Sequence, residues 1–580
     1  MAVRRWTIAG WLAVLLLLAR PADGTPATAG DGVRFGPDRA IERVVVIGFD
    51  NTPLADIQAM PRLWSLISGG AVLANSHSVV PSLTHVNYAT LATGLYPSGH
   101  GVTGQTFRFG GALTRFGYWE STDQDRLPYN LAPPPWRALN ARGASVGAVG
   151  WPDMGLQTAA EVEARAVPLQ PGSPLRDDYL GVSLHRPDGT VAFGTPNLPA
   201  LFQMPRWDEP REALGAFPAT PVWATELAWW PLAATYALLA MDTHVTFTYI
   251  TRVHEGRAPE GYADRLAAND AAFARFFDSL AAIKITPANT IFVFTTDEGD
   301  YFSASGERVT NLANQLAAAT DGTVQPEMLA IASSSAPLVY ITDAQRREAT
   351  RTAILAALPQ VPGWDHAASG PVLCALHLCV ERDRARTPDL LLLGAPAWVY
   401  ATRVPGTSVE AVSGPSWTHG GVHPEMLRAW SAFVGPGVRS GAVIDAWTDN
   451  VDVMPTLQTL LALPRQPTDG HVVVEVIADA LLPADVRQQR DLLGRVAEAY
   501  KQLYAPAGSV NQALLAEAAV AIRAANPAQI GAFEQQLTER LRHRDALALR
   551  LRAWLTDALS GIPIDAAAAD TLLHEAALPR

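Results

Sequence analysis

The chain has 580 residues, of which 48% are hydrophobic and 17% are charged. This length can bury a large core, and it favours one big α/β domain with appendages over many small modules. The formal net charge of -12 argues against a nucleic-acid partner, because nucleic-acid phosphates are bound by basic surfaces.

The first 29 residues have the pattern of a signal peptide. Arg4-Arg5 precedes an apolar run from Trp11 to Ala19, and small residues that include Ala27-Thr28-Ala29 follow. The apolar run is short for a membrane span, so we expect cleavage and no stable membrane span afterwards. The protein is then expected to be secreted or periplasmic. An uncleaved anchor and a twin-arginine export signal are the alternatives for this segment.

Strand-like apolar runs alternate with helical stretches along most of the chain, a pattern typical of a mostly parallel sheet sandwiched by helices. The stretch Tyr262 to Ile283 has helical spacing and is expected to cross over between two strands. The expected strands are 44–49, 145–150, 245–251, 290–296, 337–341 and 389–393.

Polar residues follow several of these strands. In α/β sheets the chemistry lies on the loops after the carboxyl ends of the strands. Asp50, 151–153, 252–256 and Asp297-Glu298 all fall there. These loops are therefore the first place to look for a site.

Thr84 lies between a proline turn and a predicted helix that ends on Gly94. A hydroxyl at the start of a helix experiences the positive end of the helix dipole, which favours an alkoxide and an anionic substrate. A threonine before a helix is, on its own, usually just a cap. A catalytic role for Thr84 therefore needs support from the rest of the chain.

The segment from Gln105 to about Thr243 is irregular and rich in tryptophan, and we expect it to contain a lid or a pocket wall. Within it, the apolar stretch Leu227 to Met241 is too short for a comfortable span and contains Pro231. We expect a buried core helix there instead.

Two cysteines, Cys374 and Cys379, are separated by four residues. In an exported protein this spacing predicts a local disulfide. A metal pair completed by His377 is the alternative, although no second Cys/His pair lies nearby in the sequence.

The last hundred residues, 481–580, form a predicted helical C-terminal extension. The composition shifts there to Ala, Leu, Arg and Gln, with helical periodicity at 485–504, 511–525 and 527–559 and breaks at 506–508 and 561–563. We expect this extension to be a packing or partner surface rather than a catalytic unit.

Five motifs occur in a fixed order along the chain. They are Asp50 after the first strand, Pro-Ser-Leu-Thr-His-Val-Asn at 81–87 with Thr-Gly-Leu-Tyr-Pro-Ser-Gly-His-Gly at 93–101, Thr-Thr-Asp-Glu-Gly at 295–299, Trp-Thr-His-Gly-Gly at 417–421, and Asp-Val-Met-Pro-Thr at 452–456. This set resembles the alkaline phosphatase superfamily, and most closely its type I phosphodiesterase/nucleotide pyrophosphatase branch. The resemblance covers about residues 40 to 475. It implies an alkaline-phosphatase-like catalytic domain over 40–480, with 105–243 as its lid or pocket insert.

The resemblance also implies a site. Family members hold two zinc ions on either side of a Thr or Ser nucleophile, an arrangement that suits phosphate esters. Asp50, Thr84 and Asp297 match ligands of the second metal site, and Thr84 matches the nucleophile. His419 matches a ligand of the first site. Asn87 matches the asparagine that contacts a phosphoryl oxygen.

Two positions depart from the family pattern. Glu298 stands where the family has the histidine of Asp-His-Gly, so an imidazole ligand is replaced by a carboxylate. His254, Ala258 and Gly261 stand where the family has an aspartate, a histidine and a glycine. The first site thus loses its aspartate, for which His254 is a substitute, and loses a histidine at Ala258.

Three interpretations of the metal site follow. Asp50, Asp297, Glu298 and the Thr84 hydroxyl offer only oxygen, which suits Ca²⁺, Mg²⁺ or Mn²⁺ better than zinc. Alternatively, His254 and His419 with a nearby carboxylate such as Glu255 build a modest zinc site. In the third interpretation the site is degenerate and keeps the fold and an anion pocket with little hydrolysis.

The function that the resemblance implies is metal-dependent hydrolysis of phosphodiester or pyrophosphate bonds through Thr84. The substrate would be a small phosphate ester or a nucleotide. One alternative is a catalytically weakened family member that serves as an anionic-ligand-binding envelope protein. Another is hydrolysis of a different ester, such as a sulfate or phosphonate.

Overall fold

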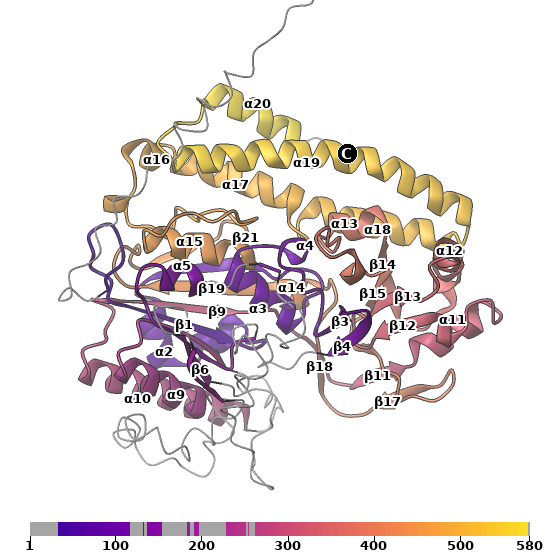
Figure 1. Cartoon of the computed structure of the whole chain (residues 1–580), viewed down its shortest axis with the longest axis horizontal. Helices are drawn as coiled ribbons and strands as arrows, with labels where there is room; N and C mark the ends of the chain where they lie inside the picture. The colour runs from indigo at the N-terminus through magenta and orange to yellow at the C-terminus, as the bar shows by residue number, and fades with distance from the viewer. Residues whose placement is uncertain are drawn as a thin grey trace, which may run out of the picture.

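The computed structural model describes residues 33–115, 131–132, 136–152, 182–185, 191–195, 228–250, 253 and 261–577. The predicted signal peptide and His254 lie outside these residues, as does most of the predicted lid. Figure 1 shows a layered arrangement, with a central sheet between two sets of helices.

The central sheet is mixed and mostly parallel, as predicted. In sheet order the strands are β20 (Ala442–Ile444), β2 (Ala71–His77), β19 (Arg428–Val434), β9 (Thr290–Thr296), β1 (Arg43–Phe49), β8 (Val245–Ile250), β5 (Val146–Val149), β6 (Val182–His185) and β7 (Val191–Thr195), with β21 (Thr448–Asp449) beside β2. The middle strands β5, β8, β1 and β9 all run parallel, whereas β19, β6 and β7 pair antiparallel to their neighbours. The first four predicted strands are therefore confirmed.

The last two predicted strands exist but belong to a second sheet. They are β13 (Leu338–Ile341) and β15 (Leu390–Gly394), which pair antiparallel with each other and with β12 (Leu329–Ala332) and β14 (Trp364–Ser369). The expectation that they extend the parallel sheet was wrong. Both are short apolar runs, and such a run indicates a buried strand without indicating which sheet buries it.

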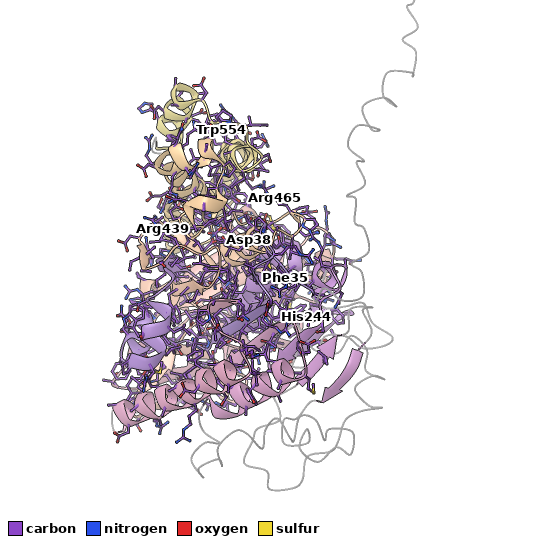
Figure 2. All side chains as sticks on the ribbon, turned by 90° about the vertical axis from the view of Figure 1, so that its left-hand side faces the viewer. Phe35, Asp38, His244, Arg439, Arg465 and Trp554 are labelled. Atoms are coloured by element: carbon purple, nitrogen blue, oxygen red, sulfur yellow. A yellow bond between two sulfur atoms is a disulfide. The ribbon has the colours of Figure 1, made fainter. Side chains whose placement is uncertain are left out.

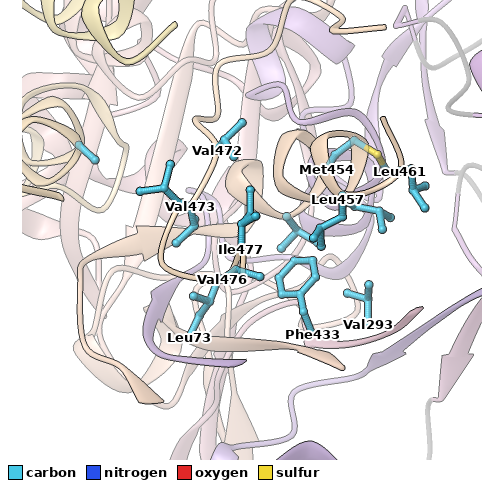
Figure 3. Close-up of a cluster of buried hydrophobic side chains, with 14 of the residues drawn as sticks. Leu73, Val293, Phe433, Met454, Leu457, Leu461, Val472, Val473, Val476 and Ile477 are labelled. Carbon is cyan, nitrogen blue, oxygen red and sulfur yellow. The ribbon is translucent and has the colours of Figure 1, made fainter. Parts of the chain in front are cut away.

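The two faces of the central sheet are covered by different helices. Along β1, Val45, Ile47 and Phe49 pack on one face with α2 and α10, while Val44 and Val46 pack on the other with α15. The helices of the first face are α1 (Leu54–Gln58), α2 (Pro61–Ile67), α9 (Trp229–Ala240) and α10 (Tyr262–Ala282), and those of the second include α3 (Thr84–Thr93) and α15 (Val453–Leu460). Figure 3 shows the second core, in which Phe433 of β19 faces Leu457 of α15.

Two predicted helices are confirmed. The crossover helix between β8 and β9 is α10, and the apolar stretch before β8 is α9, whose side chains from Leu232 to Leu239 are buried. Across the parts of the chain that the structure describes, no helix combines the length and the apolar character that a membrane crossing requires.

The C-terminal extension is helical, as predicted. Its helices are α16 (Ala484–Gln488), α17 (Arg490–Tyr504), α18 (Ser509–Arg523), α19 (Pro527–Ala558) and α20 (Ala566–Ala577). Apolar residues of α17 and α19, such as Val496 and Leu551, belong to the same core as β1 and α15. Figure 2 shows these helices stacked on the side of the sheet opposite α10, with Trp554 of α19 among them. The domain boundary at 480–481 stays a prediction.

The predicted local disulfide joins Cys374 to Cys379 beside α13 (Pro371–Ala375). His377 lies within this loop, but its Nε2 is 2.8 Å from the carbonyl oxygen of Tyr504, and its ring stacks on Tyr96. The alternative of a Cys/His metal pair is therefore wrong.

His100, at the end of α4 (Pro97–His100), is buried as a neutral imidazole. The Val102 N–H donates to its Nδ1 at 3.1 Å, and its Nε2 is 3.1 Å from the Thr90 hydroxyl. Because that hydroxyl already donates to the Val86 carbonyl, the imidazole must donate to it through Nε2. Burial, assisted by the charge of Arg386, lowers the pKa of His100 to about 3.

This histidine predicts acid sensitivity. Below the ordinary pKa of 6.5, His100 is protonated in the unfolded chain but stays neutral in the folded protein. The free energy of unfolding therefore falls as pH falls. Between pH 7 and about pH 5, His100 is expected to lower the free energy of unfolding by about 2 kcal/mol. Urea unfolding of wild type and His100→Gln at pH 7 and 5 measures it. We expect the difference in unfolding free energy between the two proteins to shrink by that amount at pH 5, and a constant difference would contradict the prediction.

Candidate active site

Three carboxylates meet where two central strands end. Asp50 follows β1, and Asp297 and Glu298 follow β9, which pairs in parallel with β1. Parallel strands bring their carboxyl ends to one edge, and one oxygen from each of the three side chains lies within 4.8 Å of the others. The residues are 6%, 0% and 0% exposed. The sequence prediction that these residues converge is confirmed.

The neighbouring Gly299 makes this strand end possible. Its N–H donates to the Met426 carbonyl at 3.0 Å, and a Cβ built on it would lie 2.0 Å from the Glu425 carbonyl oxygen. The backbone after Glu298 therefore passes too close to residues 425–428 for any side chain at 299.

The electrostatics of the cluster favour a cation. Burial, followed by the charge of Asp50, raises the pKa of Asp297 well above its ordinary value. Burial and the charges of Asp297 and Asp50 do the same for the pKa of Glu298. Asp297 Oδ1 accepts from two backbone N–H groups, yet its buried Oδ2 has no hydrogen-bond partner among the described residues. Three crowded carboxylates with an unpaired oxygen fit a divalent metal, which would replace the missing positive charge.

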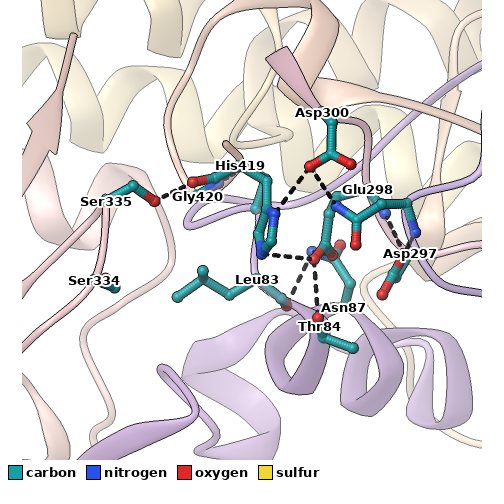
Figure 4. A network of polar contacts seen from close by, with 12 residues as sticks. Leu83, Thr84, Asn87, Asp297, Glu298, Asp300, Ser334, Ser335, His419 and Gly420 are labelled. Atoms are coloured by element: carbon teal, nitrogen blue, oxygen red, sulfur yellow. Dashed lines mark hydrogen bonds and ion pairs between the residues drawn. The ribbon is translucent and has the colours of Figure 1, made fainter. Parts of the chain in front are cut away.

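Thr84 is the first residue of α3 and faces this cluster (Figure 4). Its hydroxyl donates to Glu298 Oε1 at 3.1 Å, and the residue is 8% exposed. The helix ends at Gly94 in a left-handed conformation, as the sequence predicted. A hydroxyl at a helix N-terminus, bonded to a carboxylate beside a cation site, has the surroundings of an activated nucleophile.

Asn87 lies one turn further along α3. Its Nδ2 donates to Glu298 Oε2 at 3.0 Å, so both Glu298 oxygens are held by the first turn of this helix. Its Oδ1 accepts from the Val79 N–H and from Asn450 Nδ2. The predicted contact of Asn87 with a phosphoryl oxygen stays a prediction, and the structure places its amide at the cluster where such an oxygen would be met.

His419 follows β18 (Ser416–Thr418) and borders the cluster. Its Nε2 is 4.0 Å from Glu298 Oε1, and its Nδ1 is 3.0 Å from Asp300 Oδ1. The Ser335 hydroxyl donates to its carbonyl (Figure 4). Although burial opposes protonation, the hydrogen bond and charge of Asp300 and the other carboxylates raise the pKa of His419. The structure therefore brings His419 to the site with Asp300 as its partner.

The remaining predicted ligand, His254, and the positions Glu255 and Ala258 lie outside the described residues. His419 is thus the member of the predicted first metal site that the structure describes.

Sequence reasoning missed two of the residues that shape the site. Asn51 donates its N–H to Asp297 Oδ1 and its side-chain amide to Asp300, and it adopts the left-handed conformation that asparagine tolerates. Asn450 donates to both Asn87 and the Asp297 carbonyl. Asn51 directly follows the strand-end Asp50, which was an available signal, and Asn450 lies two residues before the 452–456 motif, which was a weaker signal.

The comparisons with known proteins agree with this geometry. Residues 44–422 match the family model of type I phosphodiesterase / nucleotide pyrophosphatase. Among solved structures, an inactive threonine-to-alanine variant of murine ectonucleotide pyrophosphatase/phosphodiesterase 5 in complex with AMP is 14% identical, with a TM-score of 0.50 over 75% of this chain and 100% of that one. A second structure of that murine protein is 15% identical, with a TM-score of 0.48 over 74% and 97% of the two chains.

No curated protein matches the chain. The structural likeness shows a shared alkaline-phosphatase-like fold, and the family model covers more than half of the residues. The chain therefore belongs to the type I phosphodiesterase/nucleotide pyrophosphatase family of hydrolases.

Proposed function

We propose that the protein is an exported, divalent-metal-dependent enzyme that hydrolyses phosphodiester or pyrophosphate bonds with Thr84 as nucleophile. The observation that carries the proposal is the hydrogen bond from the Thr84 hydroxyl to Glu298, next to Asp50 and Asp297 at the start of α3. A hydroxyl, a proton acceptor and a cation site then lie within one hydrogen-bonded group.

Several residues of the site have distinct roles in the proposed reaction. Glu298 Oε1 accepts the hydroxyl proton as Thr84 Oγ1 forms a bond to phosphorus and the bond from phosphorus to the leaving oxygen breaks. The dipole of α3 favours the negative charge on the attacking oxygen. Water then attacks phosphorus in the resulting threonine phosphodiester, the bond from phosphorus to Thr84 Oγ1 breaks, Oγ1 takes back the proton from Glu298, and the water proton passes to solvent as a phosphate monoester is released. His419, whose pKa is raised, offers positive charge to phosphate oxygens at the edge of the cluster.

Asp50, Asp297 and Glu298 would hold the metal, and a bound cation supplies the charge that offsets both the carboxylates and the phosphate. An all-oxygen set suits Mg²⁺, Mn²⁺ or Ca²⁺, while zinc is the metal implied by family resemblance.

The substrate class we propose is a nucleotide or a small phosphate ester. Its support is the family membership and the AMP that occupies the murine protein of the same fold. Export is supported by the signal-peptide pattern of residues 1–29 and by the Cys374–Cys379 disulfide, since disulfides persist in oxidising compartments.

The test is hydrolysis by the purified protein. We expect release of p-nitrophenol from bis(p-nitrophenyl) phosphate and from a nucleoside p-nitrophenyl phosphate, stimulated by one of Zn²⁺, Mn²⁺, Mg²⁺ or Ca²⁺ and abolished by a chelator. Matched aryl sulfate and phosphonate esters are the controls for another ester specificity. No release from either phosphodiester with any of the four metals would overturn the proposal and favour an anionic-ligand-binding protein.

A further inference from the structure

A buried lysine of the C-terminal extension is connected to the candidate active site through a short chain of hydrogen bonds. Lys501, on α17, is fully buried. Its Nζ lies 2.6 Å from Asp449 Oδ1 and 2.7 Å from Asp452 Oδ1. Burial alone would lower the pKa of Lys501, but the two carboxylates raise it, so the ammonium stays charged.

Asp449 precedes the short turn η6 (Asn450–Asp452), Asp452 is its last residue, and the two aspartates fix its shape. The Asp449 N–H donates to Asp452 Oδ2 at 3.0 Å, and the N–H of His471 donates to Asp452 Oδ1 at 2.9 Å. Both carboxylates are 1% exposed or less. With Lys501 bridging them, the turn has little freedom to move.

The turn η6 contacts two active-site residues, Asn87 and Asp297, through Asn450. Asn450 is fully buried, and its Nδ2 lies 2.9 Å from Asn87 Oδ1 and 2.6 Å from the Asp297 carbonyl oxygen. The Val79 N–H also donates to Asn87 Oδ1, so this oxygen faces two donors. The Asn87 amide is thereby oriented with Nδ2 toward Glu298.

A second contact ties the same turn to the far end of α3. Tyr96 follows the last residue of this helix by three positions, and its hydroxyl donates to Asp449 Oδ2 at 2.7 Å. The turn η6 therefore contacts α3 in its first turn through Asn87 and beyond its end through Tyr96. The position of Thr84 relative to the end of β9 depends on these contacts.

We propose that Lys501 is a positioning residue for this active site: by bridging Asp449 and Asp452 it fixes η6, and through Asn450 it sets Asn87 and the end of β9 against Thr84. The kinetic part of this inference rests on the proposed function. Asn450 and Lys501 both lie beyond residues 44–422 that the family model matches, so the C-terminal extension contributes to the site of the family domain.

The competing interpretation is that Lys501 only fastens the extension to the core. A matched control exists for that role. Glu534 on α19 pairs with Arg351 of the neighbouring α12 (Arg347–Ala357) at 2.6 Å, with both side chains less than 15% exposed. This pair also fastens the extension, but it contacts neither η6 nor the carboxylate cluster.

The experiment compares four variants of the full-length protein and, as a fifth, Lys501→Met combined with Asn450→Ala. Lys501→Met removes the bridge, and Lys501→Met/Asp449→Asn removes it while avoiding an uncompensated buried carboxylate, because Asp452 keeps His471 as its partner. Asn450→Ala removes the bonds to Asn87 and Asp297 but leaves the ion cluster in place. Glu534→Gln is the control.

We expect Lys501→Met and its double variant to lower kcat about tenfold with KM changed less than about twofold, since the loss is one of positioning. Asn450→Ala should give a similar fall, and adding it to Lys501→Met should lower kcat by less than a further factor of about 2, because both act through one connection. Glu534→Gln should lower the melting temperature without changing kcat. Unchanged kcat in the lysine variants, or fully additive effects with Asn450→Ala, would overturn the inference.

Hydrogen exchange separates this inference from the proposed function. We expect faster amide exchange at residues 84–90 and 297–299 in the lysine variants than in Glu534→Gln, whether or not the wild-type protein hydrolyses a phosphodiester. Equal exchange there would overturn the positioning role. An inactive wild-type protein would overturn the proposed function alone.

Discussion

Replacing Thr84 by alanine is expected to lower kcat for bis(p-nitrophenyl) phosphate by a factor of at least about 10³. The hydroxyl that donates to Glu298 is the attacking group in the proposed reaction, and alanine offers no oxygen to phosphorus. The three carboxylates are untouched, so divalent-metal binding should persist, weakened only by loss of the Thr84 hydroxyl as a predicted ligand. Initial rates at saturating substrate, with metal affinity measured by calorimetry, check both expectations.

Two further variants make this result specific. Thr84→Ser keeps a hydroxyl and should retain kcat within about tenfold. Thr90→Val removes a buried hydroxyl from the same helix, one that bonds Val86 and His100 rather than the cluster, and should reduce stability without reducing kcat. If Thr84→Ala kept kcat within about tenfold of wild type, nucleophilic attack by Thr84 would be wrong.

The second large effect concerns Asp297→Asn, for which stability and function should change in opposite directions. Without metal, three carboxylates share a buried space, and burial and mutual repulsion raise the pKa values of Asp297 and Glu298. Removing one charge relieves that repulsion, so the metal-free variant should be more stable than metal-free wild type by about 1 kcal/mol. The same change removes a metal ligand and should abolish metal-stimulated hydrolysis.

Thermal unfolding of wild type and Asp297→Asn, each with and without metal, measures both the stability of the metal-free protein and the stabilisation by metal. Metal at about 100 times its Kd should stabilise wild type by about 2.7 kcal/mol and the variant by much less. Asp270→Asn is the control, because Asp270 is also buried but its Oδ1 accepts hydrogen bonds from the Arg62 and Leu63 N–H groups at the start of α2. It should lose stability and keep the metal response. A metal-free Asp297→Asn protein that is less stable than wild type would contradict the prediction.

Local signals predicted the parts of the site that depend on strand and helix ends. Asp50 and Asp297 end parallel strands, and Thr84 begins a helix that Gly94 terminates, so their convergence follows from the rules of parallel sheets. Glu298 was recognised as a departure from a family pattern. Its hydrogen bonds to Thr84 and Asn87 had no signal in the sequence.

The rest depended on contacts between distant segments. Asp452 begins the last of the five sequence motifs, yet in the structure it contacts Lys501 and His471. Asn450, two residues earlier, contacts the active site instead. Neither the strand pattern nor the motif order indicates which of the two polar residues of this three-residue turn, Asn450 or Asp452, points toward the active site. Likewise, the apolar runs of β13 and β15 do not indicate that these strands belong to a separate sheet.

The place of β19 in the central sheet has a consequence for biosynthesis. This strand lies between β2 and β9 but follows both in the chain. During synthesis, β2 and β9 emerge with no strand between them, and the gap cannot be filled until residue 434 has been made. Open strand edges pair with other chains, and a nascent or truncated chain that stops at 422, where the family match ends, lacks β19, β20 and β21 and leaves open edges on both β2 and β9. An expression fragment that is meant to stay soluble therefore has to include β19.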